Sequence, residues 1–165
     1  QAATLTADTV AQEAIQALRT VTDKKVDLST AGYYASVDNS KLDVTGQQLP
    51  NDTSRQLIVW EADCKHVSSN RVGCVHAPKV ATSTLPSNWS AQYVIFRMCK
   101  AAGEVNPETC AMPTTSTSGT STKRGKLDYA DYARFGSAAS PYYRVIVRIQ
   151  GDRNTVSYTE TLVHF

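Results

Sequence analysis

The sequence lacks any run of about 18 or more apolar residues, so we expect neither a transmembrane helix nor a signal peptide within it. It also lacks a Gly-x-Ser-x-Gly elbow, a glycine-rich phosphate loop and a His-Glu-x-x-His zinc helix. Only three histidines occur, and neither His66, His76 nor His164 has a local signature of catalysis. We therefore predict that the chain is not an enzyme and needs no cofactor or metal.

A strong charge of either sign is also missing. There are 17 Lys and Arg against 15 Asp and Glu, which leaves a net charge of +2. The one short basic cluster, Lys123-Arg124-Gly125-Lys126, follows a Ser/Thr tract, and we interpret it as a solvated loop rather than a nucleic-acid patch. No internal repeat is visible, and 165 residues is the usual length of one domain, so we expect a single domain over residues 1–165.

Residues 1–25 predict an amphipathic helix, uninterrupted by Gly or Pro. Its small apolar residues allow close approach to a sheet. On a helical wheel the predicted apolar stripe contains Ala3, Ala7, Val10, Ala11, Ala14, Ala17, Leu18 and Val21. The opposite face contains Asp8, Gln12, Glu13, Gln16 and Arg19. The remainder, residues 26–165, reads as mainly sheet and loops.

Residues 142–165 predict a β-hairpin, with turn residues at Gly151-Asp152-Arg153-Asn154. Side chains in the first strand alternate with a period of two, which is typical of a half-buried strand, and Ile146 is the exception. One face contains Tyr143, Val145, Val147 and Ile149, and the other contains Arg144, Arg148 and Gln150. Further strands are expected over roughly 56–62 and 91–99, with the hairpin strands over 142–150 and 155–164.

This C-terminal part resembles PilX-type minor pilins of bacterial type IV pili. The shared pattern is Tyr-Arg, an apolar run and a second Arg, then a Gly-containing turn and Arg-Asn-Thr-Val-Ser-Tyr. Residues 93–99, Tyr-Val-Ile-Phe-Arg-Met-Cys, resemble the strand before it, followed by a loop closed at Cys110. The resemblance covers about the last 75 residues. It implies an α+β, pilin-like fold in which a long N-terminal helix packs on an antiparallel β-sheet.

The resemblance also implies a function and a location. The expected role is a structural minor pilin, contributing to pilus assembly and a tip complex and so to cell adhesion and twitching motility. Expected partners are other minor and major pilins, an adhesin-like protein at the tip, and the inner membrane. Since the first residue is Gln1, we expect a soluble ectodomain without the apolar N-terminal helix. Its location would be the bacterial inner membrane and periplasm before assembly, and the extracellular pilus afterwards.

An alternative is a secreted, disulfide-stabilised binding domain unrelated to pili. Two Asn-x-Ser/Thr sequons, at Asn51 and Asn88, would suit such a protein. A secreted hydrolase is a weaker reading, because no nucleophile with a base can be named.

Four cysteines, Cys64, Cys74, Cys99 and Cys110, form two neighbouring pairs with loops of about ten residues. Three connectivities are possible, and we favour Cys64–Cys74 and Cys99–Cys110 because each loop leaves a strand-like segment and contains turn formers. Two disulfides would imply an oxidising, periplasmic or extracellular setting. The repeated Cys-x-His of Cys64-Lys65-His66 and Cys74-Val75-His76 is a competing zinc pattern, but its ligand spacing is unusually short.

The last candidate lies in a loop region. Asp128 and Asp131 are close in sequence, yet they lack the spacing of a calcium loop, so we interpret them as solvated. The loop over 111–127 contains a Ser/Thr tract too polar to order itself, and it is expected to be a surface loop with an open functional role.

Overall fold

The computed structural model describes residues 2–45, 54–61, 73–113 and 140–165. Among these residues there is one α-helix, α1 (Ala2–Thr20), and two short 3-10 helices, η1 (Ser29–Ala31) and η2 (Asp152–Asn154). The short strands are β1 (Tyr33–Tyr34), β2 (Leu42–Asp43), β3 (Gln56–Ile58), β4 (Cys74–His76) and β5 (Lys79–Val80). The long strands are β6 (Ser90–Arg97), β7 (Tyr143–Gln150) and β8 (Val156–Val163).

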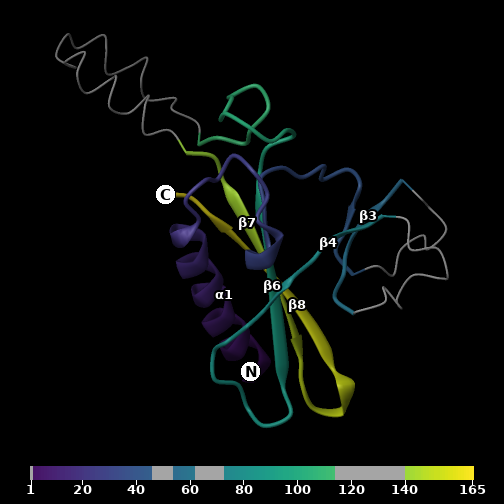
Figure 1. Cartoon of the computed structure of the whole chain (residues 1–165). Coiled ribbons are helices and arrows are strands. Elements are labelled where there is room, and N and C mark those ends of the chain that lie inside the picture. The colour runs from purple at the N-terminus through teal and green to yellow at the C-terminus, as the bar shows by residue number, and fades with distance from the viewer. Residues whose placement is uncertain (1, 46–53, 62–72, 114–139) are drawn as a thin grey trace.

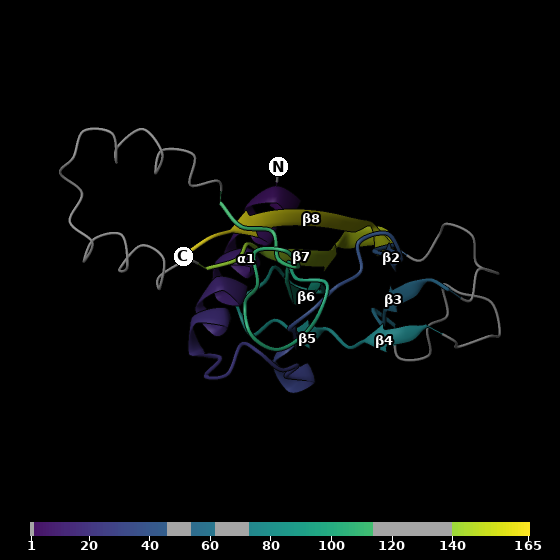
Figure 2. The same ribbon diagram turned by 90° about the horizontal axis from the view of Figure 1, so that it is seen from above.

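These elements form three layers, with α1 on one face of a five-stranded sheet and a smaller sheet towards the other (Figures 1 and 2). The large sheet has the order β1-β6-β7-β8, and β5 also pairs with β6. β5, β6, β7 and β8 pair antiparallel with their neighbours, whereas β1 runs parallel to β6. The small sheet has the order β2-β3-β4, and both of its pairings are parallel.

The predicted fold class was therefore wrong in the arrangement of the strands. A single antiparallel sheet was expected, but the five-stranded sheet is mixed and the second sheet is entirely parallel. The description α+β holds only in a loose sense. The error has a physical cause, because β1 to β5 are two or three residues long and too short for an alternating pattern to develop.

The long elements lie close to their predicted positions. β6, β7 and β8 begin and end within about two residues of the expected strands, whereas β3 is shorter than expected and ends at Ile58. The helix was expected up to about residue 25 but ends at Thr20, and the amide of Val21 donates to the carbonyl of Leu18 at 3.2 Å.

The first hydrophobic core lies between α1 and the large sheet. The predicted stripe faces it: Ala7, Val10, Ala11, Ala14, Leu18 and Val21 are all buried, while Ala17 is partly buried against them. From the sheet, the core receives Tyr93, Ile95, Tyr143, Val145, Val147 and Ile149 among others. Small side chains along α1 let the helix lie close to the strands, which keeps the helix and sheet in a fixed relation.

A second core lies on the opposite face of the same sheet, and it explains Ile146. This residue packs with Val94 and Phe96 against Ile58 and Trp60, which come from β3 and the residues directly after it. The Trp60 indole Nε1 donates to the carbonyl of Val44 at 2.7 Å, which ties this layer together. Ile146 broke the alternation in the sequence because both faces of β7 are covered at that point.

Among the residues that the structure describes, no helix is long and apolar enough to cross a membrane.

Candidate functional site

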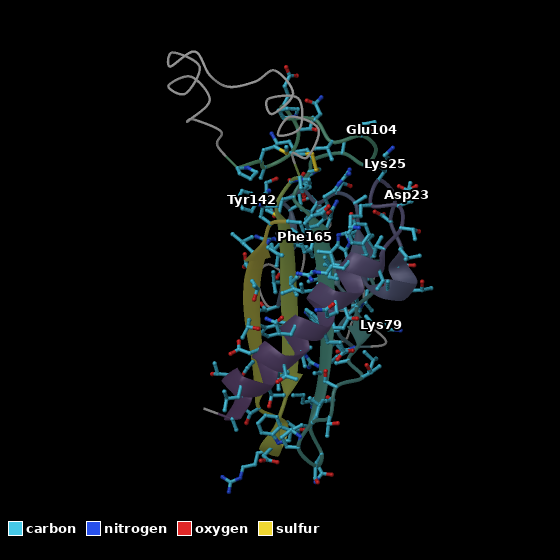
Figure 3. The ribbon with its side chains drawn as sticks, turned by 90° about the vertical axis from the view of Figure 1, so that its left-hand side faces the viewer. Asp23, Lys25, Lys79, Glu104, Tyr142 and Phe165 are labelled. Carbon is cyan, nitrogen blue, oxygen red and sulfur yellow. A yellow bond between two sulfur atoms is a disulfide. The ribbon has the colours of Figure 1, made fainter. Side chains whose placement is uncertain are left out.

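α1 crosses the sheet diagonally, so that its two ends lie at opposite ends of the molecule (Figure 3). Its first turn lies near the β7–β8 turn, where Ala3, Gly151 and Ser157 line one small hollow. Its last turn leads into Asp23 and Lys25, which lie beside Glu104 at the other end (Figure 3). We call this second end, made of residues 21–28, 97–111 and 164–165, the loop end.

A disulfide closes the main loop of the loop end. Cys99 and Cys110 are bonded, with their Cα atoms 3.9 Å apart, which confirms the predicted pairing. Two backbone bonds flank the disulfide: Lys100 donates to the carbonyl of Thr109 at 2.8 Å, and Ala111 donates to that of Met98 at 2.7 Å. The loop is thus pinned at its base, directly where β6 ends.

The second predicted pair is only partly visible. Cys74 is disulfide-bonded, but its predicted partner Cys64 lies outside the described residues, so the pairing Cys64–Cys74 stays a prediction. His66 of the competing zinc pattern lies outside them as well. His76 does not point to solvent as a surface histidine would, since it is buried and packs edge-on against the rings of Tyr34 and Phe96.

Arg97, at the end of β6, holds the loop from inside. Its side chain is only 1% exposed, and its guanidinium donates to three backbone carbonyls. Nε reaches Ala35 O at 2.8 Å, while Nη2 reaches Gly103 O at 2.8 Å and Ala101 O at 3.3 Å. A buried cation is costly without such partners, so these bonds fix the loop to the sheet.

The sequence pattern did not identify this role for Arg97. The sequence did contain an indication of it, however. Arg97 lies on the same face of β6 as Tyr93 and Ile95, which packs on α1 and where an apolar residue is expected.

The loop also docks on the segment that follows α1. Gly103 donates its amide to the carbonyl of Lys25 at 2.8 Å, and the Lys25 ammonium lies 2.5 Å from the Glu104 carboxylate. The hydrogen bond to Glu104 raises the pKa of Lys25. Since both side chains are exposed, the ion pair contributes little stability, and it serves mainly to orient the two segments.

The segment after α1 is itself held by two polar contacts. The Tyr33 hydroxyl donates to the carbonyl of Lys24 at 2.6 Å, and the amide of Ala35 donates to the carboxylate of Asp27 at 2.7 Å. Burial raises the pKa of Tyr33 above its usual range, so the phenol stays neutral and remains a donor. The backbone between residues 24 and 35 therefore has a defined shape.

Apolar side chains are exposed on both joined segments. Val26 is 53% exposed and Leu28 43%, while Val105 on the disulfide loop is 38% exposed. Phe165 is 41% exposed and lies 5.5 Å from the guanidinium carbon of Arg19, measured to the ring centroid. Val26 and Val105 directly follow Lys25 and Glu104 in the chain, so exposed apolar side chains lie on both segments that the ion pair joins.

The described part of the chain contains no group of three or more His, Cys, Asp or Glu residues placed to hold a metal ion. His164 packs its ring 5.5 Å from that of Tyr142. The other sequence candidates, Asp128, Asp131, the basic cluster 123–126, Asn51 and most of the loop 111–127, lie outside the described residues. Asn88 is described and exposed, with a positive φ of 70°.

Comparison with known proteins adds no assignment: no protein-family model, no curated protein and no solved structure matches this chain.

Proposed function

We propose that this chain is a non-catalytic subunit of a type IV pilus, of the minor-pilin class. The proposal starts from the resemblance of about the last 75 residues to PilX-type minor pilins. The observation that supports it best is the placement of α1, whose apolar stripe packs on the sheet from Ala7 to Leu18 while the disulfide loop lies beside its C-terminal end.

This placement gives the two ends of the molecule different roles. Under the proposal, α1 continues at its N-terminal side into an apolar helix that anchors the subunit in the inner membrane and later packs in the filament. The loop end would then face away from the membrane. Its Val26, Leu28 and Val105 would contact the next subunit outward, either another pilin or an adhesin-like tip protein.

The rigidity of the loop end supports a binding role. A disulfide, three carbonyl bonds from Arg97 and the Lys25–Glu104 pair fix the loop before any partner arrives. Pre-organised surfaces lose little conformational entropy on binding, which favours stable assembly.

Deletion and complementation of the natural gene in its host test the proposal. Deletion should reduce sheared surface pili by about tenfold or more, and the wild-type gene should restore them. A V26D/V105D double variant should fail to restore pili, because it places two carboxylates in the proposed contact. The control is V75D, which changes an equally exposed valine on β4, outside the proposed contact, and should restore pili.

The rival function predicts a different outcome. A secreted binding domain would leave piliation unchanged on deletion and would be recovered from the culture medium rather than from sheared pili. That result would refute the pilus role. The natural gene offers a second check, since a pilus subunit requires an apolar helix encoded in continuity with α1.

A further inference from the structure

β8 forms one edge of the large sheet, and its outer side is open (Figure 2). The strand has eight residues and pairs with β7 in a continuous register from Gln150↔Val156 to Tyr143↔Val163. Within the described residues, no strand pairs with its other side. A free edge of this length is a template for another strand.

The hydrogen-bond pattern shows which groups face outward. Gly151 donates to the carbonyl of Thr155 at 2.8 Å, so this pair is a hydrogen-bonded one. Hydrogen-bonded and non-bonded pairs alternate along an antiparallel ladder, so residues 157, 159, 161 and 163 bond to β7. The amides and carbonyls of Val156, Tyr158, Glu160 and Leu162 therefore point to the open side.

The opposite edge of the same sheet is covered. There, β5 pairs with the first half of β6 and β1 pairs with its second half. The Glu13 carboxylate of α1 holds the segment after β5, because it accepts bonds from the amides of Thr82 at 2.7 Å and Ser83 at 2.8 Å and from both hydroxyls. Among the described strands, β8 is thus the edge that is left open.

β8 also lacks the features that normally protect an edge. It contains no proline and no lysine, and its register is not interrupted by a bulge. Its one charged residue, Glu160, is neutralised by Arg144, whose Nε and Nη2 both lie 2.9 Å from the carboxylate oxygens. Val156 and Leu162 are 37% and 60% exposed on the face opposite α1, where they would flank an added strand.

We propose that the open edge of β8 binds an extended strand of a neighbouring pilin subunit in the assembled pilus. This inference rests on the proposed function, which requires neighbouring subunits to have their α1 helices in the same direction. The partner strand is expected to place apolar side chains beside Val156 and Leu162, and to have no acidic residue beside Glu160. Two copies of this chain paired antiparallel through β8 would point their α1 helices in opposite directions, so a second copy is not the expected occupant.

Site-specific photo-crosslinking in the natural host tests this proposal. The full-length protein would have a photoreactive residue at Val156, and crosslinked peptides from sheared pili and membranes would be identified by mass spectrometry. The expected product joins residue 156 to a sheet-edge strand of a different pilin. A crosslink from residue 156 to a second copy of this chain or to lipid, or the absence of any protein crosslink, would overturn the proposal.

A pair of variants adds a readout that is independent of the crosslinked product. Leu162→Pro removes an outward amide without removing a bond to β7, and Leu162→Thr shortens the side chain while it keeps that amide. The proline variant should lower the crosslink yield at least about tenfold, and the threonine variant should change it much less. Equal yields would count against strand pairing. Thermal unfolding of both purified variants would show that the fold is kept.

Failure of the inference and failure of the proposed function are distinguishable. If the protein is absent from sheared pili and its deletion leaves piliation unchanged, the function itself is wrong. If the protein is present and required, yet residue 156 gives no pilin crosslink, only the role of the β8 edge is wrong.

Discussion

We predict that the protein loses stability in mild acid, because the His76 side chain is buried. Its ring is 7% exposed and lies edge-on to Tyr34 and Phe96, with ring centroids 4.7 and 4.9 Å away. Nε2 lies 3.4 Å from the Gln56 side-chain oxygen, and Nδ1 has no hydrogen-bond partner. Burial lowers the pKa of His76 to about 4, although the charge of Asp27 acts in the other direction.

The sign and size of the effect follow from this lowered pKa. Above the unfolded pKa of 6.5 the imidazole is neutral in both states, and the full stability is present. As the pH falls towards 4, the unfolded chain takes up a proton that the folded chain refuses, so the free energy of unfolding decreases. A difference of roughly 2.5 pKa units corresponds to about 3 kcal/mol, of which about 2 kcal/mol is lost between pH 7 and pH 5.

Urea unfolding at several pH values between 7 and 5 measures this loss, with His76→Phe as the matched variant that cannot titrate. The wild-type free energy of unfolding should fall by about 2 kcal/mol over this range, and that of the variant should stay nearly constant. The pH range from 7 to 5 lies above the titration of Glu13. Burial raises the pKa of Glu13, but the hydrogen bonds from Ser83 and Thr82 outweigh burial, so the net pKa is lowered. Parallel pH profiles for the two proteins would refute the assignment.

Two further predictions concern packing and the disulfides. Ala14 of α1 is fully buried against the sheet and should not tolerate arginine. Ala14→Arg should cost at least about 3 kcal/mol, because it buries an unpaired charge. Gln12→Arg on the exposed face should change stability by less than about 0.5 kcal/mol, and equal unfolding midpoints would contradict the packing. Non-reducing peptide mapping should recover a peptide that joins Cys64 to Cys74. A free thiol with bound zinc would exclude that bond.

Periodicity predicted the long elements well, since a long element repeats its pattern several times. Five residues of the stripe are buried within α1, and Val21 is buried directly after it. The predicted inner face of β7 is buried as well, although Ile146 and Arg148 on its other face are also buried. The stripe on α1 faces a single neighbour, the large sheet, so its spacing in the sequence reports directly on that contact.

The small sheet could not be predicted in the same way. β2, β3 and β4 pair in parallel, with partners such as Leu42 and Gln56 that are distant in the sequence. A strand of two or three residues has no measurable period, and its pairing depends on contacts distant in sequence. Their burial comes from the large sheet, so nothing within the segments themselves indicates the layer.

In the candidate site, too, local contacts were predictable from the sequence and contacts between distant segments were not. The Cys99–Cys110 bond was predictable from spacing and turn residues, because both cysteines lie at the base of one local loop. The contacts of Lys25 with Glu104 and of Arg97 with Ala35 join segments more than sixty residues apart. Only the folded chain brings these groups together.

Two residues at unexpected positions in their strands nevertheless indicated where other parts of the fold pack on the sheet. Ile146 is apolar on the polar face of β7, and Arg97 is charged on the apolar face of β6. An apolar residue on a polar face requires a second cover, and here that cover is the small sheet. A charged residue on an apolar face requires hydrogen-bond acceptors inside the fold, and here they are the carbonyls of the disulfide loop. Each of these two residues therefore marks a place where a further layer or loop docks on the sheet, and both lie on strands next to the proposed contact surfaces.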